Sequence, residues 1–174
     1  KYEANDILMN FVDNHDENSW NGTIQSRLGA AEEAMTALTY VMPGMPLVYS
    51  GNEYGLNHSL KFFEKDSIPK VKGKDWELRA KLGQLKKDNP ALNGGKNPAG
   101  FNRINTSSDS TILAFEREKE GKKVIYVANL SKTNQKVKLE ISGTFTNFMT
   151  NEKVTLSEGK EISLQPWQYY ILTN

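Results

Sequence analysis

The stretch that decides the fold is residues 8–16, which read Leu-Met-Asn-Phe-Val-Asp-Asn-His-Asp. Its first five residues are mostly apolar, and the run stops abruptly at four polar residues, Asp13 to Asp16. A short apolar run that ends in polar residues predicts a buried strand followed by a loop. Taken alone, the polar cluster is equally typical of a helix N-cap or a turn, which Asn and Asp side chains form readily.

A helix and a second strand follow this stretch. Apolar residues recur three or four positions apart between Ile24 and Met42, which predicts an amphipathic helix that Pro43-Gly44 ends. A second apolar run, 46–49, again ends in polar residues. Strand, helix and strand in this order predict a βαβ unit with parallel strands. A further helix is predicted over about 75–88.

The second half of the chain has a different pattern. From about residue 101 we predict eight short strands, and Glu120-Gly121 and Ser142-Gly143 supply hairpin residues between them. The predicted strands are 101–105, 111–118, 122–129, 135–141, 144–149, 152–156, 160–164 and 167–173. Short strands at this spacing predict an antiparallel β-sandwich. The fold class is therefore α/β plus all-β, with a first domain at 1–95 and a second at 96–174.

Composition excludes several function classes. The chain has 174 residues, a formal net charge of +1 and no cysteine. Its lysines are interleaved with acidic residues, so we expect no nucleic-acid partner. No apolar run approaches the roughly 20 residues of a membrane span, so we expect no membrane partner. His15 and His58 lack metal-ligand spacing, and we expect no metal site.

The chain opens at Lys1 without a signal pattern, which favours a piece of a longer protein.

Polar residues at the carboxyl end of a buried parallel strand occupy the position where α/β barrels place their active sites. Two such clusters occur, 13–16 and 50–53, and the first packs four polar groups directly after the apolar run. These clusters are the candidate site.

The sequence resembles the α-amylase family of glycoside hydrolases in four segments, in the family's order. Residues 11–16 resemble its fourth conserved region, at the end of the seventh barrel strand, and 44–53 resemble its eighth-strand segment. Residues 85–95 are similar to the stretch that closes its last barrel helix, and 166–170 to the final strand of its C-terminal domain. The resemblance implies a partial (β/α)8 TIM barrel, strands 7 and 8 with their helices, followed by an antiparallel Greek-key β-sandwich.

The resemblance also implies roles for single residues. Asp16 would be the carboxylate that holds sugar hydroxyls and strengthens that hold in the oxocarbenium-like transition state, and His15 would donate a hydrogen bond to the same sugar. Asn14 would shape the loop. Trp20 would either offer a flat face to a sugar ring or serve ordinary packing. Glu53 would support the end of the eighth strand.

The family's catalytic nucleophile and general acid lie on its fourth and fifth strands, which no part of this chain resembles. We therefore expect the 174 residues to be inert by themselves, although the parent enzyme would act on α-glucosidic linkages of starch or maltooligosaccharides. Two points stay open: whether that enzyme hydrolyses its substrate or transfers a glucosyl unit, and whether it acts on 1,4 or 1,6 linkages. We expect no cofactor in this chain, with calcium possible in the parent. The localisation stays open, with a secreted or periplasmic location favoured for the parent. The barrel edges would be exposed, which predicts either self-association or disorder before residue 60, with the sandwich as the independently stable part.

Two alternatives remain. The sandwich could be a carbohydrate-binding module that stacks sugars on Trp167, Tyr169 or Tyr170, although core packing is the commoner use of residues in a terminal strand. The chain could also be a non-catalytic structural relative of the family.

Overall fold

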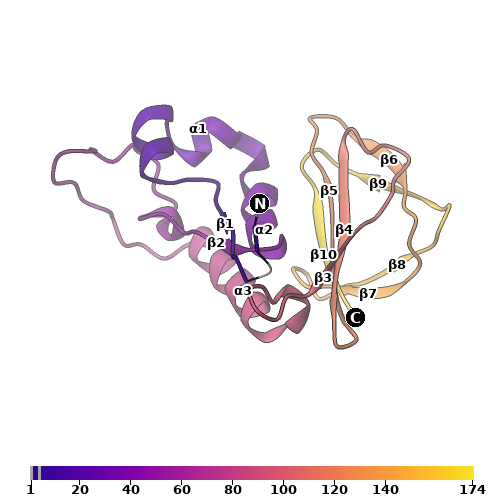
Figure 1. The fold of residues 1–174 in the computed structure, drawn as a ribbon. Helices are drawn as coiled ribbons and strands as arrows, with labels where there is room; N and C mark the ends of the chain where they lie inside the picture. Colours follow the sequence, from indigo (N-terminus) through magenta and orange to yellow (C-terminus); the bar gives the residue numbers. More distant parts are fainter. Residues whose placement is uncertain (1, 4) are drawn as a thin grey trace. The chain divides into compact units, whose positions relative to one another are not determined.

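The computed structural model describes residues 2–3 and 5–174. The chain forms two compact units, Lys1–Asp88 and Asn89–Asn174, which Figure 1 shows in indigo to pink and in pink to yellow.

The first unit holds a parallel strand pair joined through helices. Strand β1 (Met9–Asn10) pairs in parallel with β2 (Met45–Pro46), as the sequence predicted. The connection contains the π-helical turn η1 (Glu17–Asn21), helix α1 (Ile24–Leu28), the 3₁₀ turn η2 (Gly29–Ala31) and helix α2 (Glu32–Val41). After β2 come the 3₁₀ turn η3 (Asn52–Tyr54), a long loop and helix α3 (Lys74–Asp88).

The strand pair depends on a close approach at Gly44. The Met45 N–H donates to the Leu8 carbonyl at 2.9 Å. Gly44 has φ of 115°, and a Cβ there would collide with the same Leu8 oxygen. Only glycine tolerates both the backbone conformation and the contact.

Three expectations for this unit were wrong. The strands are shorter than predicted, and Leu8, Met9 and Phe11 are exposed rather than buried. Within the described residues β1 pairs with β2 alone, so both strands are edge strands. The helix predicted from Ile24 to Met42 is broken after Leu28, because Gly29 adopts φ of 52° and ends α1.

Helices α2 and α3 supply the core of the unit. Helix α2 buries a continuous run of side chains, and α3 packs against it through Leu82 and Leu85. Arg79 of α3 is also buried, where its guanidinium pairs with Asp75 one turn earlier at 3.4 Å. The pair satisfies a charge that burial would otherwise make costly.

The second unit is antiparallel throughout, and each of the eight strands predicted for it is found. Six strands form one sheet in the order β3-β4-β5-β10-β7-β8, and β6 and β9 form a second sheet of two. The strands are β3 Gly100–Arg103, β4 Ile112–Lys119, β5 Lys122–Asn129, β6 Gln135–Lys138, β7 Gly143–Asn147, β8 Lys153–Leu156, β9 Glu161–Leu164 and β10 Tyr169–Thr173. Val137 and Leu164 of the small sheet share one buried cluster with Ile125 and Leu172 of the large one.

The other face of the large sheet is also covered. The 3₁₀ turn η4 (Pro90–Leu92) contacts β4 and β5, and its Ala91 and Leu92 are buried. Arg117 of β4 is buried as well, and its guanidinium donates to the carbonyls of Asn93 and Gly100 at 3.0 and 2.9 Å. Residues from 89 onward therefore pack within the second unit.

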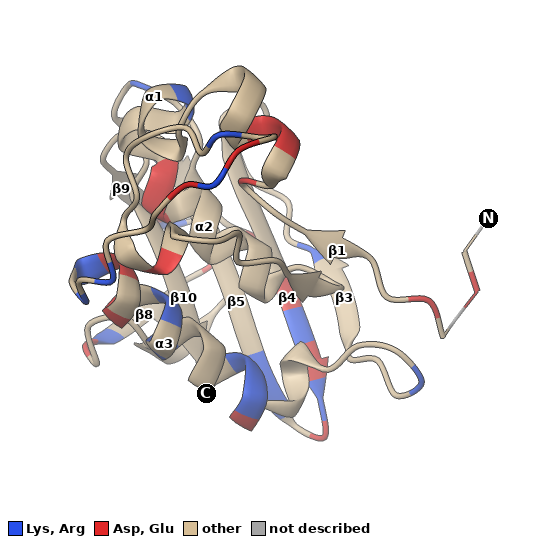
Figure 2. Ribbon diagram, turned by 90° about the vertical axis from the view of Figure 1, so that its left-hand side faces the viewer, with Lys and Arg blue, Asp and Glu red and all other residues tan. Residues whose placement is uncertain are grey.

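Charges of both signs alternate on this sheet. Figure 2 shows Lys and Arg segments beside Asp and Glu segments on β4 and β5. Lys123 of β5 pairs with Glu116 of β4, Nζ to Oε2, at 2.8 Å. Cross-strand pairs of this kind neutralise the sheet locally and add a few tenths of a kcal/mol up to about 1 kcal/mol.

The two hairpin predictions had different outcomes. Glu120 and Gly121 close the β4–β5 hairpin with φ of 53° and 76°, the signs of a type I′ turn. The prediction for Ser142-Gly143 was wrong, because β6 and β7 belong to different sheets. Gly143 instead makes room for the ring of Phe145, which lies where its Cβ would be.

The β4–β5 turn offers a matched pair of substitutions. Gly121→Ala places a side chain in open space but at positive φ, so we expect a loss of about 1–2 kcal/mol. Glu120→Asn replaces a residue that disfavours this conformation with one that tolerates it, and should gain up to about 1 kcal/mol. Urea unfolding followed by the amide signals of β4 and β5 measures both. Equal midpoints for the wild type and Gly121→Ala would show that the turn does not constrain the hairpin.

Candidate functional site

A buried carboxylate, Asp13, organises the residues that follow β1. Its side chain is fully buried, and Oδ1 accepts a hydrogen bond from Nη2 of Arg27 at 2.7 Å. Oδ2 accepts from the side-chain amide of Asn52 at 3.0 Å. Burial raises the pKa of Asp13, while the hydrogen bond from Asn52 and the charge of Arg27 lower it. Asp13 thus joins the loop after β1 to helix α1 and to the loop after β2.

Arg27 extends the same network. Besides Asp13, its guanidinium donates to the carbonyls of Val12 and Gly22, each at 3.0 Å, and it lies 3.5 Å from the carboxylate of Glu17. These contacts tie the beginning and the end of the segment 13–22 to one side chain. We call Asp13, Arg27 and Asn52 the clamp.

The predicted loop at 13–16 is the start of a helix. The Asn14 side chain accepts from the backbone N–H of Glu17 at 2.8 Å, and the Asn14 carbonyl accepts from the N–H of Asn18 at 3.0 Å. Asn14 therefore caps a helical segment that includes His15 and Asp16 and continues as η1. Of the two readings of the cluster, the N-cap is the one found, with Asn14 as the capping residue.

His15 and Asp16 lie side by side and open to solvent. Their side chains are 64% and 61% exposed, and His15 Nε2 is 3.7 Å from Asp16 Oδ2. An exposed pair of this kind contributes little to stability. Both groups are instead available to a ligand, held on a helical turn whose ends are fixed by the clamp.

Trp20 lies on the same helical segment and joins a group of aromatic rings. Its ring centroid is 5.3 Å from that of Phe62 and 6.5 Å from that of Phe63. Phe62 and Phe63 are 4.8 Å apart, and Phe62 is 5.8 Å from His15. Trp20, Phe62 and Phe63 are called the aromatic group below.

Glu53, the candidate after β2, supports its own loop. Its Oε2 accepts from the N–H of Gly51 at 3.1 Å, and the neighbouring Tyr54 ring stacks on Trp76 of α3 at 5.5 Å. These are local structural contacts, which agree with the supporting role expected for it.

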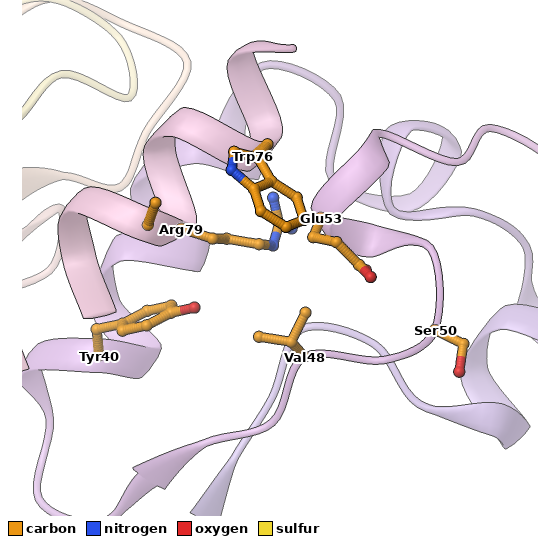
Figure 3. A pocket seen from close by; sticks show the side chains of 7 residues that line it. Tyr40, Val48, Ser50, Glu53, Trp76 and Arg79 are labelled. Atoms are coloured by element: carbon orange, nitrogen blue, oxygen red, sulfur yellow. The ribbon is translucent and has the colours of Figure 1, made fainter. Parts of the chain in front are cut away.

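A cavity of about 460 Å³ lies between α2, the segment 48–53 and α3. Figure 3 shows Tyr40 and Val48 pointing toward it and the ring of Trp76 beside it. Arg79 also lines it, with its charge already paired with Asp75. None of His15, Asp16 and Trp20 is among its lining residues, so the cavity and the cluster after β1 are separate features.

In residues 2–3 and 5–174, no group of three or more His, Asp or Glu side chains could hold a metal ion. No helix in the described part of the chain is long and apolar enough to cross a membrane.

Two of the three aromatic residues proposed for sugar stacking in the second unit, Tyr169 and Tyr170, are engaged in packing. The Tyr169 ring stacks on that of Tyr126 at 6.1 Å, and Tyr170 packs against the buried cluster between the sheets. Trp167 occupies a turn with φ of 60°, directly after Pro166.

Sequence reasoning missed the roles of Arg27, Asn52 and the Phe62-Phe63 pair. Arg27 lies inside the predicted helix, where the pattern assigns it no role, and Asn52 was seen only as part of the second polar cluster. The pair had a readable signal, because two adjacent phenylalanines in the charged loop 61–66 are unusual for a solvated segment.

Comparison with known proteins follows the division into two units. Residues 102–171 match the family model of the maltogenic amylase C-terminal domain. No curated protein matches the sequence significantly.

Solved structures match nearly the whole chain. A noncanonic maltogenic α-amylase, AmyB, from Thermotoga neapolitana aligns with 97% of this chain at a TM-score of 0.81 and 20% identity. α-Amylases from Anoxybacillus and Lactobacillus plantarum align with 96% and 99% at TM-scores of 0.72 and 0.73 and identities of 22% and 18%. The chain covers 41%, 38% and 39% of those three chains, about two fifths of their length. At these identities the likeness shows a shared fold.

The stability of the first unit should depend strongly on the pairing of Asp13 with Arg27. Arg27→Met leaves the Asp13 carboxylate buried without its counter-charge, and we expect the first unit to lose about 3–5 kcal/mol of stability. The double variant Asp13→Asn/Arg27→Met removes the stranded charge and should recover part of that loss. Urea unfolding followed by amide signals of α2 and α3 measures each variant. If the loss in the double variant equals the sum of the losses in Arg27→Met and Asp13→Asn, the two residues are not coupled.

Proposed function

We propose that this chain is the C-terminal part of a retaining α-amylase-type glycoside hydrolase. Two findings support this: residues 102–171 match the maltogenic amylase C-terminal domain, and the chain shares its fold with α-amylases over nearly its whole length. In this proposal the first unit contributes the seventh and eighth βα units of a (β/α)8 barrel, and the second unit is the C-terminal sandwich. The substrate class is α-glucosidic linkages of starch or maltooligosaccharides.

The observation that carries the proposal is the placement of Asp16. The polar cluster 13–16 after β1 contains two aspartates. Asp13 is buried in the clamp, whereas Asp16 is 61% exposed next to His15. A carboxylate accepts hydrogen bonds from sugar hydroxyls, and an imidazole can donate one. Such bonds strengthen as positive charge develops on the sugar ring in the transition state, and so accelerate glycoside cleavage.

The mechanism requires groups beyond Asp16. Retaining hydrolysis needs a nucleophilic carboxylate and a general acid about 5–5.5 Å apart. We assign those groups to segments outside these residues, and with them any calcium site. Asp16 then stabilises a transition state that the other two carboxylates create, and the chain by itself should not hydrolyse glucans.

The exposed strand pair supports the barrel assignment. Leu8, Met9 and Phe11 of the β1 segment and Met45 and Val48 of the β2 segment are all more than 39% exposed. Large apolar side chains on two short parallel strands require a cover, which neighbouring barrel strands would provide. Without that cover the same edges favour self-association.

Binding of maltotriose to the 174-residue chain tests the proposal. We expect saturable changes in the amide signals of residues 14–22, because His15 and Asp16 are open to ligand. Asp16→Asn should weaken the affinity at least about tenfold, the usual worth of a hydrogen bond to a charged group.

Asp88→Asn serves as the control, because Asp88 is also exposed but lies at the end of α3. It should leave the affinity unchanged. Shifts confined to residues 89–174, or equal affinities for Asp16→Asn and the wild type, would contradict the assignment of Asp16. Release of glucose or maltose by the chain would contradict the placement of the nucleophile and acid outside it.

A further inference from the structure

We propose that Trp20, Phe62 and Phe63 form a stacking platform for a second glucose ring, next to the ring that Asp16 holds. This inference rests on the proposed function and deepens it, since it assigns specificity residues to a loop that no motif marks. The ligand is an α-glucan segment of two or more rings.

The first observation is the exposure of the three rings. Trp20, Phe62 and Phe63 are 62%, 40% and 85% exposed. They nevertheless contact one another, with centroids 4.8–6.5 Å apart. Scattered exposed apolar residues need no explanation, but a contiguous aromatic surface marks a binding site.

The second observation is that the loop bearing the phenylalanines is fixed to the helical segment bearing Trp20. Asn18 of η1 is buried, and its Oδ1 accepts from the backbone N–H of Leu60 at 2.7 Å. The Ser19 hydroxyl donates to the Leu60 carbonyl at 2.9 Å. Both the N–H and the carbonyl of Leu60 are thus hydrogen-bonded to η1. Phe62 and Phe63 follow only two and three residues later, so their backbone is held close to Trp20.

Further contacts keep the loop in shape beyond this point. Asp66 accepts from the backbone N–H groups of Lys61 and Ser67 at 3.1 and 2.7 Å. Lys61 Nζ also pairs with Glu64 at 2.9 Å. These contacts fix the segment between Lys61 and Ser67, which carries the two exposed rings.

The third observation is continuity with the proposed catalytic subsite. Phe62 contacts the ring of His15, and His15 lies against Asp16. Trp20 is four residues beyond Asp16 on the same helical segment. A sugar chain gripped by Asp16 and His15 would therefore continue over the platform.

A sugar suits this surface better than a protein partner does. Glucose rings present C–H groups on their faces and hydroxyls at their edges, so an aromatic face and a charged rim suit them. A stable protein interface buries about 800 Å² on each side. Three aromatic side chains supply at most about 450–750 Å² even when wholly buried, and these are already partly covered.

The experiment compares ligands of different length on the same chain. Methyl α-glucoside, one ring long, reaches only the Asp16 position, while maltotriose also reaches the platform. We expect maltotriose to bind the wild type about three- to tenfold more tightly, from the apolar area it covers. Phe63→Ala and Phe62→Ala should both remove this gain. Phe63→Ala, which alters neither Asp16 nor the ring that contacts His15, should also leave binding of methyl α-glucoside unchanged.

Tyr2→Ala is the matched control, an exposed aromatic residue of the same unit outside the platform. It should keep the full gain. Tryptophan fluorescence gives an independent readout when the wild type is compared with Trp20→Phe, because Trp76 and Trp167 also emit. Maltotriose, but not methyl α-glucoside, should change the emission of the wild type, and Trp20→Phe should lose this change.

The outcomes separate this inference from the proposed function. Loss of affinity in Asp16→Asn together with an unchanged length gain in both Phe variants overturns the platform and leaves the proposed function standing. Loss of the gain in the Phe variants with no effect of Asp16→Asn supports the platform and removes Asp16 from the site. Concentration-dependent association that Phe63→Ala abolishes, with no effect on sugar binding, overturns the platform in favour of a contact between copies of the chain.

Discussion

The candidate site depends on one buried carboxylate and the two side chains that bind it. Asp13 has no access to water, and a charge in that position costs several kcal/mol unless it is paired. Arg27 and Asn52 supply the pairing from α1 and from the loop after β2. The clamp therefore determines where the chain goes after β1, and with it the positions of His15, Asp16 and Trp20.

The two aspartates of one short cluster have opposite uses. Asp13 is buried and accepts hydrogen bonds from Arg27 and Asn52, whereas the Asp16 carboxylate is exposed and accessible to a ligand. Asn14 separates them and starts the helical turn that points Asp16 away from the clamp. A rigid support directly beneath an open carboxylate is what transition-state binding requires, because a group that must reorganise loses part of its effect.

Strand patterns in the second unit were predictable because each follows from local rules. Alternating polarity sets the strands, and Glu120-Gly121 sets a turn that both residues close at positive φ. The errors came where tertiary contacts decide. Ser142-Gly143 reads as a hairpin, but the chain crosses between sheets there, and Gly29 breaks a helix whose apolar spacing is regular. The polar cluster after β1 was predicted as a site, but which aspartate is buried depends on Arg27, fourteen residues away, and on Asn52. The Phe62-Phe63 pair stands out in the charged segment 61–66, but its contact with Trp20 could not be predicted from the pattern, because that contact depends on the hydrogen bonds that join Asn18 and Ser19 to Leu60.

The clamp orders the loop that carries Asp16. Amide hydrogen exchange in the Asn52→Ala variant tests it most directly, because Asn52 touches Asp13 but none of residues 14–22 by any hydrogen bond described above. In this variant we expect the amides of Glu17, Asn18 and Leu60 to exchange at least about tenfold faster than in the wild type, while those of β4 and β5 are unchanged. Wild-type exchange rates at Glu17, Asn18 and Leu60 in this variant would contradict it.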